Sequence, residues 1–254
     1  MPPRTLSTAL DVKIEAGQPP HIKIFRAHSV VLCARSPYLQ AELATLSNMP
    51  NPLIKIPFIA PNIMEILLKY MYHNKLTLNS DHIEYILDLL VAGHDLGLQA
   101  LCEELQLYLI QKKSLLLLQN FAQTRRIAYQ HEAFKRLQIF CEQVISNYPE
   151  TVFMAKDFVL LDRQTLLSLL QRDDLTVKEI NIWQRVIEWG IAHTFNINSL
   201  NFSSEWTPEQ FASLQVTLAE FLPLVRIFQI SAVDLHARVF PFESILPNQV
   251  VEDL

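Results

Sequence analysis

Residues 25–39 read Phe25-Arg26-Ala27-His28-Ser29-Val30-Val31-Leu32-Cys33-Ala34-Arg35-Ser36-Pro37-Tyr38-Leu39, and this stretch decides the fold. Just before it, residues 11–15 and 21–25 alternate apolar and polar side chains, as half-buried strands do. The segment between them, residues 16–20, combines a glycine with two prolines that cannot donate to a sheet, which predicts a hairpin loop. After His28 the alternation gives way to a short helical run. Ser36 is a good N-cap and Pro37 a good first residue, so a second helix is predicted to start there.

The next segment, to residue 111, continues the same unit with a strand and several helices. Residues 53–56 predict a short buried strand. Apolar side chains then recur at the helical period, first after Ala60 and again in two further runs. The two last runs are separated by Gly93-His94-Asp95-Leu96-Gly97, which predicts a tight corner between helices.

This order of elements resembles the BTB/POZ family. That family's signature begins with a strand that starts with Asp and a second strand that ends in Ala-His. A short helix containing Val-Leu follows, and then the sequence Ala-Arg-Ser-Pro-Tyr, at which a second helix begins. The corresponding residues are Asp11, Ala27-His28, Val31-Leu32 and residues 34–38. The resemblance implies a small sheet flanked by helices over residues 1–111. Residues 70–76 resemble the family's aromatic-rich helix end, which implies a short strand after them.

A second resemblance covers residues 152–189. This stretch resembles the BACK domain, a helical module that commonly follows BTB. The matching features are Asp157-Phe158 followed by Leu161, a Leu-rich turn at residues 166–175, and a helix carrying Trp183 and Trp189. The two resemblances imply an α+β chain, with a BTB/POZ fold at 1–111, an all-α BACK domain at 112–240 and a tail at 241–254. Residues 230–241 resemble the end of fungal-type BTB–BACK proteins, which often carry a TLD or kelch domain.

Composition narrows the class of protein. Half of the 254 residues are hydrophobic, and the formal net charge is −5, which favours neither nucleic-acid binding nor attraction to an anionic membrane. The three cysteines, Cys33, Cys102 and Cys141, are scattered in apolar helical settings, as buried thiols in a reducing compartment are. No apolar run approaches the length of a membrane span. We expect a soluble protein of the cytoplasm, or of the nucleus.

Residues that could carry chemistry do not form a recognised arrangement. The eight histidines show neither a His-Glu-x-x-His motif nor paired Cys/His spacing. His28 is better explained as a buried structural histidine whose ring hydrogen-bonds at the strand-to-helix junction. There is no Gly-x-Ser-x-Gly, and Gly93 and Gly97 are not followed by the Lys-Ser/Thr of a phosphate-binding loop. Cys33 beside Arg35 is better explained as a core thiol. We expect no enzymatic activity, no cofactor and no metal.

The resemblance implies a protein-interaction function. BTB domains of this type commonly bind the cullin of a RING-type ubiquitin ligase and present a substrate, so we expect an adaptor; the alternative is a BTB–BACK oligomerisation scaffold that binds no cullin. In cullin-binding members the contact surface comes from the helix after the Ser-Pro restart, the following loop and the last helix–helix corner. The matching segments here are residues 38–46, 47–51 and 93–98. The protein-interaction residues expected from them are Tyr38, Glu42, Leu46, Met49, Asn51, His94, Asp95 and Leu96.

Three departures from the family pattern carry further expectations. Cullin-binding members usually have a hydrophobic-x-Glu motif in the loop that follows the second helix. The matching residues here are Met49-Pro50-Asn51, which have the apolar residue but not the carboxylate. Homodimerising members usually have a long helix before the first strand, whereas ten residues with Pro2-Pro3 stand there, so we expect a monomer or a weak homodimer. Many members have a basic residue after the His that pairs with the first-strand Asp. Ser29 stands there, and we expect the Asp11 pair to be missing.

Overall fold

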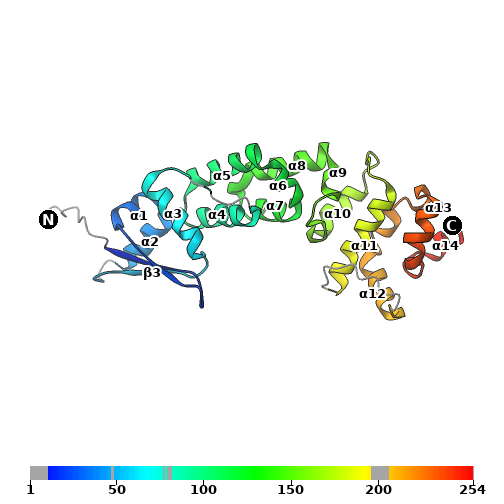
Figure 1. Cartoon of the computed structure of the whole chain (residues 1–254), viewed down its shortest axis with the longest axis horizontal. Coiled ribbons are helices and arrows are strands. Elements are labelled where there is room, and N and C mark those ends of the chain that lie inside the picture. The colour runs from blue at the N-terminus through cyan, green and yellow to red at the C-terminus, as the bar shows by residue number, and fades with distance from the viewer. Residues whose placement is uncertain (1–10, 47–48, 77, 79–81, 196–205, 254) are drawn as a thin grey trace. The chain divides into compact units, whose positions relative to one another are not determined.

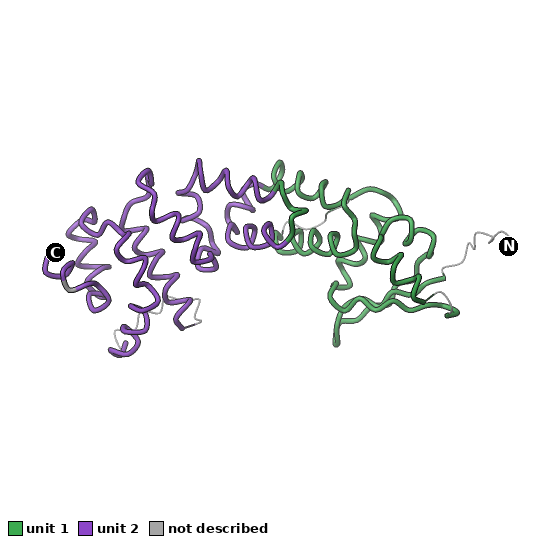
Figure 2. The backbone as a smooth tube through the Cα atoms, turned by 180° about the vertical axis from the view of Figure 1, so that it is seen from behind, with its two compact units in different colours: residues 1–113, 131–136 green, residues 114–130, 137–254 purple. Residues whose placement is uncertain are grey.

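The structure is a computed structural model that describes residues 11–46, 49–76, 78, 82–195 and 206–253. The chain forms two compact units. Unit 1 consists of residues 1–113 and 131–136, and unit 2 of residues 114–130 and 137–254 (Figure 2). Each unit is described by itself below.

Unit 1 begins with the predicted hairpin. Strands β1 (Val12–Ala16) and β2 (Lys23–Ala27) pair antiparallel, and each starts one or two residues later than the alternation indicates. The loop needs Gly17, because its φ is +91° and a Cβ there would lie 2.2 Å from the carbonyl oxygen of His21. The sheet is completed by β3 (Leu53–Ile56), parallel to β1, in the order β2–β1–β3.

Helices cover one face of this sheet. Helix α1 (Ser29–Arg35), α2 (Pro37–Thr45) and α3 (Pro61–His73) lie on one side of it in Figure 1. The strands turn alternate side chains toward them, so Val12, Ile14 and Ile54 are buried. Asn74 caps the end of α3: its backbone is left-handed, and its N–H bonds the carbonyl of Tyr70 at 2.7 Å.

The predicted strand at residues 53–56 and the start of a second helix at Pro37 are therefore confirmed, but the strand is half-buried and not buried as predicted, because Leu53 and Lys55 are exposed. The family resemblance also implied a short strand after residues 70–76. That stretch runs into residues 77 and 79–81, which lie outside the described residues.

Two longer helices and a short turn complete unit 1. Helices α4 (Ile83–Asp95) and α5 (Gln99–Lys112) bury continuous apolar stripes against each other and the rest of the unit. The 3-10 turn η1 (Glu132–Phe134) belongs to this unit although it comes much later in the chain. The buried amide of Gln106 on α5 holds it: Nε2 donates to the carbonyl of Ala133, and Oε1 accepts from the N–H of Arg136, both at 3.2 Å.

The described residues of unit 2 form helices joined by turns and loops, without a strand. Its helices are α6 (Ser114–Gln119), α7 (Phe121–Ala128), α8 (Lys135–Asn147, from Leu137 onward), α9 (Pro149–Phe153), α10 (Arg163–Leu170), α11 (Glu179–Phe195), α12 (Pro208–Leu218), α13 (Ala232–Asp234) and α14 (Asn248–Asp253). Short 3-10 or π turns connect them: η2 (Phe158–Leu160), η3 (Leu222–Leu224), η4 (Ile227–Gln229), η5 (Leu235–Val239) and η6 (Phe240–Ile245).

The long helix α11 organises unit 2. Trp183 and Trp189 are buried, and their indole N–H groups donate to the carbonyls of Arg238 and Leu161 at 3.1 and 2.8 Å. Gly190 lets α12 approach closely, because a Cβ there would lie 2.7 Å from side-chain atoms of Leu218. Asp157, the acidic residue of the BACK-like pattern, caps α7 by accepting from the N–H groups of Ala122 and Gln123.

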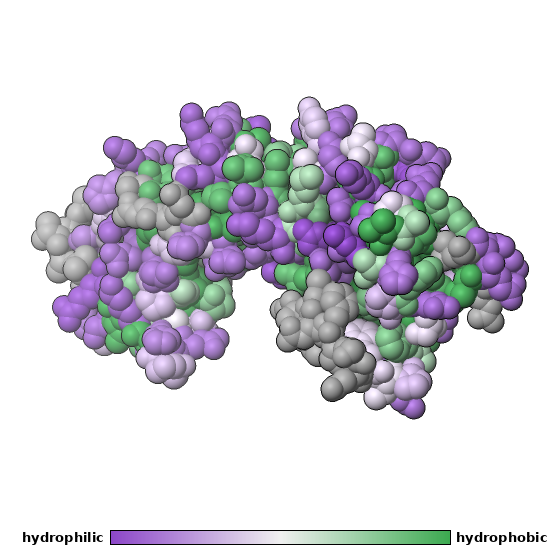
Figure 3. All heavy atoms as spheres, turned by 45° about the vertical axis from the view of Figure 1, so that its right-hand side comes forward, coloured by the Kyte–Doolittle hydropathy of each residue, from purple (hydrophilic) through white to green (hydrophobic). Residues whose placement is uncertain are grey.

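The segment expected as a tail does not trail from unit 2. Phe242, Ile245 and Leu246 are buried there, and η6 packs on α12. On the face shown in Figure 3, hydrophobic side chains occur in patches between hydrophilic ones. None of the helices in the described part of the chain has the length and hydrophobicity needed to cross a bilayer.

Candidate functional site

The start of α2 and the corner between α4 and α5 are fastened together by Ser36. Its buried Oγ accepts from the N–H of Leu39, capping α2 at 3.1 Å, and donates to the carbonyl of Leu96 at 2.6 Å. Gly97 adds a close approach: its φ is +74°, and a Cβ there would lie 2.9 Å from Cδ of Pro37. Two of the three segments expected to form an interaction surface are thus neighbours, although about sixty residues separate them in the chain.

An aromatic pair with an acidic rim lies at this junction. The rings of Tyr38 and Phe58 meet edge to face, with centroids 6.1 Å apart, and Phe58 is 54% exposed. Partial burial raises the pKa of Tyr38, and the carboxylates of Glu42 and Asp95 raise it further. We name Tyr38, Glu42, Phe58 and Asp95 the docking surface. Its charge is negative and its centre is aromatic.

Phe58 was missed by sequence reasoning. It lies in the turn after β3 and belongs to no apolar stripe. The available signal was an aromatic residue directly after Pro57, in a turn with no strand or helix to bury it.

The loop after α2 is exposed where it is described. Met49 is 62% exposed, and its N–H bonds the carbonyl of Leu46, so the loop stays close to the end of α2. Leu46 itself is half-buried. Asn51 has φ 58°, the left-handed conformation that Asn tolerates better than most residues. Residues 47 and 48 lie outside the described part of the loop.

The corner residues differ in accessibility. Asp95 is exposed, and the half-buried ring of His94 packs on those of His131 and Phe134, with centroids 4.2 and 5.4 Å away. Leu96 is 0% exposed, so its side chain cannot contact a partner, contrary to our expectation. Its role is internal, because its carbonyl receives the hydrogen bond from Ser36. The helical period places position 96 on the core side at the end of α4.

The expected loss of the Asp11 pair is only half right. Ser29 cannot supply a positive charge, but its N–H and Oγ donate to the two carboxylate oxygens of Asp11 at 2.7 and 2.6 Å. Burial opposes ionisation of Asp11, yet these hydrogen bonds outweigh it and hold the pKa below its ordinary value. His28 lies alongside and is half-buried, not buried as expected. Its Nδ1 is 2.8 Å from the hydroxyl of Tyr72, so the predicted hydrogen bond at the strand-to-helix junction is present.

The thiols have different environments. Burial raises the pKa of Cys102 and of Cys141 to about 12, so both stay protonated at neutral pH and are poor nucleophiles. Cys33 is half-buried, which corrects its interpretation as a core thiol. No three His, Cys, Asp or Glu side chains among the described residues lie together in a way that could hold a metal ion.

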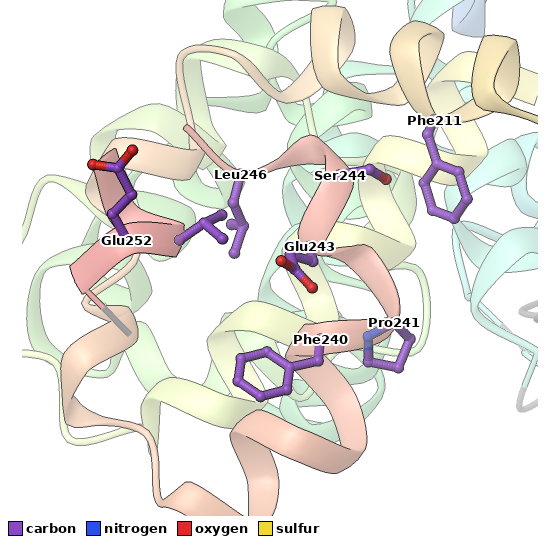
Figure 4. Close-up of a pocket in the computed structure, with 8 residues that line it drawn as sticks. Phe211, Phe240, Pro241, Glu243, Ser244, Leu246 and Glu252 are labelled. Carbon is purple, nitrogen blue, oxygen red and sulfur yellow. The ribbon is translucent and has the colours of Figure 1, made fainter. Parts of the chain in front are cut away.

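Unit 2 contains an open pocket of about 570 Å³ near its carboxyl end, lined by Phe211, Phe240, Pro241, Glu243, Ser244, Leu246, Val251 and Glu252. Figure 4 shows the carboxylates of Glu243 and Glu252 well apart, with Phe211 and Phe240 also separated. Small-molecule sites usually have a few polar groups that converge on one point. The residues of this pocket therefore give it no defined ligand chemistry.

Comparison with known proteins adds two family matches. Residues 3–113 match the family described as BTB/POZ domain, and residues 121–199 match BACK, described as BTB And C-terminal Kelch. Both are protein-interaction families.

Curated relatives resemble the chain over much of its length. Bovine BTB/POZ domain-containing protein 9 is 28% identical over 178 residues, which is 69% of this chain and 28% of that protein. Mouse Kelch-like protein 8 is 25% identical over 211 residues, which is 82% of this chain and 31% of that protein. The chain thus spans less than a third of the length of these relatives. Among solved structures, the BTB domain of zebrafish PATZ1 matches with 22% identity and a TM-score of 0.34, over 41% of this chain and 77% of that one.

Proposed function

Because the chain consists of a BTB/POZ domain followed by a BACK domain, we propose that it is a non-enzymatic adaptor of a cullin-RING ubiquitin ligase, with the cullin bound at the docking surface of unit 1. The client would be recognised elsewhere. In this proposal the protein works in the cytoplasm or nucleus, where free cysteines remain reduced.

The observation that carries the proposal is the construction of the docking surface. An exposed ring supported edge to face by a second ring is the kind of anchor that supplies much of an interface's binding energy. Ser36 and Gly97 hold the start of α2, which carries Tyr38, against the corner that carries Asp95 before any partner arrives. Such preorganisation lowers the entropy lost on binding.

One observation favours the alternative, an oligomerisation scaffold that binds no cullin. The loop offers Met49 as an apolar contact, but Asn51 stands where the hydrophobic-x-Glu motif of the binders has its carboxylate. A carboxylate at the rim of an interface acts mainly on association rate and salt dependence. We therefore expect cullin binding that is present but weakened.

Calorimetry with purified cullin N-terminal domains tests the proposal. Phe58→Ala should weaken binding by about tenfold or more, since a central aromatic anchor contributes at least ~1.4 kcal/mol. The matched control is Phe228→Ala in unit 2, where the ring is 63% exposed and outside the docking surface. That substitution should leave binding unchanged.

A second variant restores the missing carboxylate. Asn51→Asp suits this position better than Asn51→Glu, because a left-handed residue other than Gly, Asn or Asp costs about 1–2 kcal/mol. Asn51→Asp should strengthen binding. Absence of binding by every cullin to both the wild type and Asn51→Asp would refute the adaptor function and favour the scaffold.

A further inference from the structure

The sheet of unit 1 leaves one face and the edge of β2 open within the described residues. Its strand order leaves β2 at an edge, and α1, α2 and α3 lie on the other face (Figure 1). The open face carries six side chains in two rows: Arg26, Lys13 and Leu53 in one, and Ile24, Glu15 and Lys55 in the other. Ile24 is 56% exposed.

One row of this face contains an unusual pair. Lys13 lies directly opposite Arg26 in the register of β1 and β2, and like charges in that relation are destabilising. The third member of the row is Leu53, so this row contains no carboxylate; Glu15, in the other row of the same face, pairs with Lys55. Neither cation forms an ion pair or side-chain hydrogen bond with any described residue.

The neighbouring cations of the sheet are neutralised. Lys55 lies 3.7 Å from Glu15, and Lys23 lies 2.9 Å from Glu65 on α3. The pair of Lys13 and Arg26 is therefore an exception within its own sheet. A positive pair that the protein leaves uncompensated on an open face is suited to bind a carboxylate from outside.

The backbone beside this pair is also free to bind. The N–H of Lys13 donates to the carbonyl of Pro52, so the backbone of Lys13 faces β3 and that of Ile14 faces β2. The partner of Ile14, Phe25, then faces back toward β1. Successive residues alternate, so the N–H and C=O groups of Ile24 and Arg26 point to the open edge.

We propose that the β2 edge and the open face of the sheet bind an extended acidic segment of a partner protein, which adds to the sheet as a fourth strand. Backbone hydrogen bonds to Ile24 and Arg26 supply affinity, an apolar side chain of the segment covers Ile24, and its carboxylate lies over Arg26 and Lys13. A second copy of β2 is not a suitable occupant, because it would bring the Arg26 of the copy toward an already positive row. None of these residues belongs to the docking surface, so the inference does not depend on the proposed cullin binding.

A preorganised peptide tests the inference. The probe is a disulfide-closed β-hairpin whose outer strand alternates Val and Glu, added to the full chain and followed by NMR. We expect saturable shifts of the amides of β2 that weaken as salt is raised. A hairpin with Lys in place of Glu, and an acidic hairpin N-methylated at its outward amides, should each bind at least tenfold more weakly.

Variants identify the contacts. Arg26→Glu should abolish binding of the acidic hairpin and favour the basic one, whereas Lys156→Glu, an exposed control in unit 2, should change neither. Arg26→Glu should also raise the melting temperature, because it replaces a like-charged pair by an opposite one. The inference would be overturned if the basic hairpin, or the methylated acidic hairpin, bound as tightly as the unmethylated acidic one. It would also be overturned if the acidic hairpin did not bind at millimolar concentration, or if Arg26→Glu lowered the melting temperature.

Discussion

Replacing Ser36 by alanine tests what holds the docking surface together. The substitution removes the N-cap of α2, which costs about 1 kcal/mol. It also leaves the carbonyl of Leu96 without its donor in a buried site, which costs about 1–3 kcal/mol. Both losses come from one oxygen atom. We therefore expect the free energy of unfolding of unit 1 to fall by about 2–4 kcal/mol.

The assay must report on unit 1 alone. All three tryptophans lie in unit 2, so their fluorescence follows that unit, while hydrogen exchange of the α2 amides follows unit 1. Ser36→Ala should speed exchange throughout α2 and leave the fluorescence transition in urea unchanged. It should also weaken cullin binding, because Asp95 would no longer be held beside Tyr38.

Ser231→Ala is the matched control for this experiment. Ser231 also caps a helix, accepting from the N–H of Asp234, but it is exposed and bonds no buried carbonyl. Its loss should cost less than ~1 kcal/mol. If Ser36→Ala costs no more than Ser231→Ala, the link between α2 and the corner is not what stabilises this region.

Two further predictions concern packing and pH. Gly190→Ala should destabilise unit 2, because overpacking against Leu218 costs about 1–3 kcal/mol and exceeds the helix-propensity gain of about 1 kcal/mol. In a Leu218→Ala background the same change should stabilise the unit. Both effects are measured by tryptophan fluorescence in urea, and the same sign in both backgrounds would contradict the packing. Ser29→Ala should lower the melting temperature at pH 6–7. Because the folded pKa of Asp11 is below its ordinary value, the stabilisation from Ser29 is present above about pH 4 and is lost as the pH falls through the lowered pKa. The melting temperatures of the wild type and of Ser29→Ala should therefore converge in acid. A difference between them that does not depend on pH would show that the carboxylate is not involved.

Local patterns in the sequence predicted the elements of unit 1 well. Alternation located the hairpin to within two residues, and the Ser36–Pro37 pair located the start of α2, because strand period and helix capping act over a few neighbouring residues. Family resemblance added that the strands form one small sheet flanked by helices, and that the second unit is helical. Strand period and helix capping depend on residues close together in the chain, and a family resemblance depends on a known order of elements.

The composition of the docking surface could not be predicted in the same way. Phe58 meets Tyr38 across twenty residues of chain, and no local pattern distinguishes an aromatic residue exposed in a turn from one that is buried. Leu96 was misplaced because its position at the end of a helix looked like part of a loop. Ser29 was interpreted by charge alone, although a hydroxyl and a backbone N–H can hold a carboxylate by hydrogen bonds.

Residues 131–136 belong to unit 1 but follow the first helices of unit 2 in the chain, and this order has a consequence for synthesis on the ribosome. Phe134 is buried beside His94, and Gln106 bonds the backbone of Ala133 and of Arg136. Unit 1 therefore cannot reach its final packing when residue 113 emerges; it must wait for residue 136, by which time α6 and α7 have also been made. A truncated gene that stops at Lys113 would encode the sheet and the docking surface but would leave α5 without this cover, so an expression clone of unit 1 should extend past Arg136.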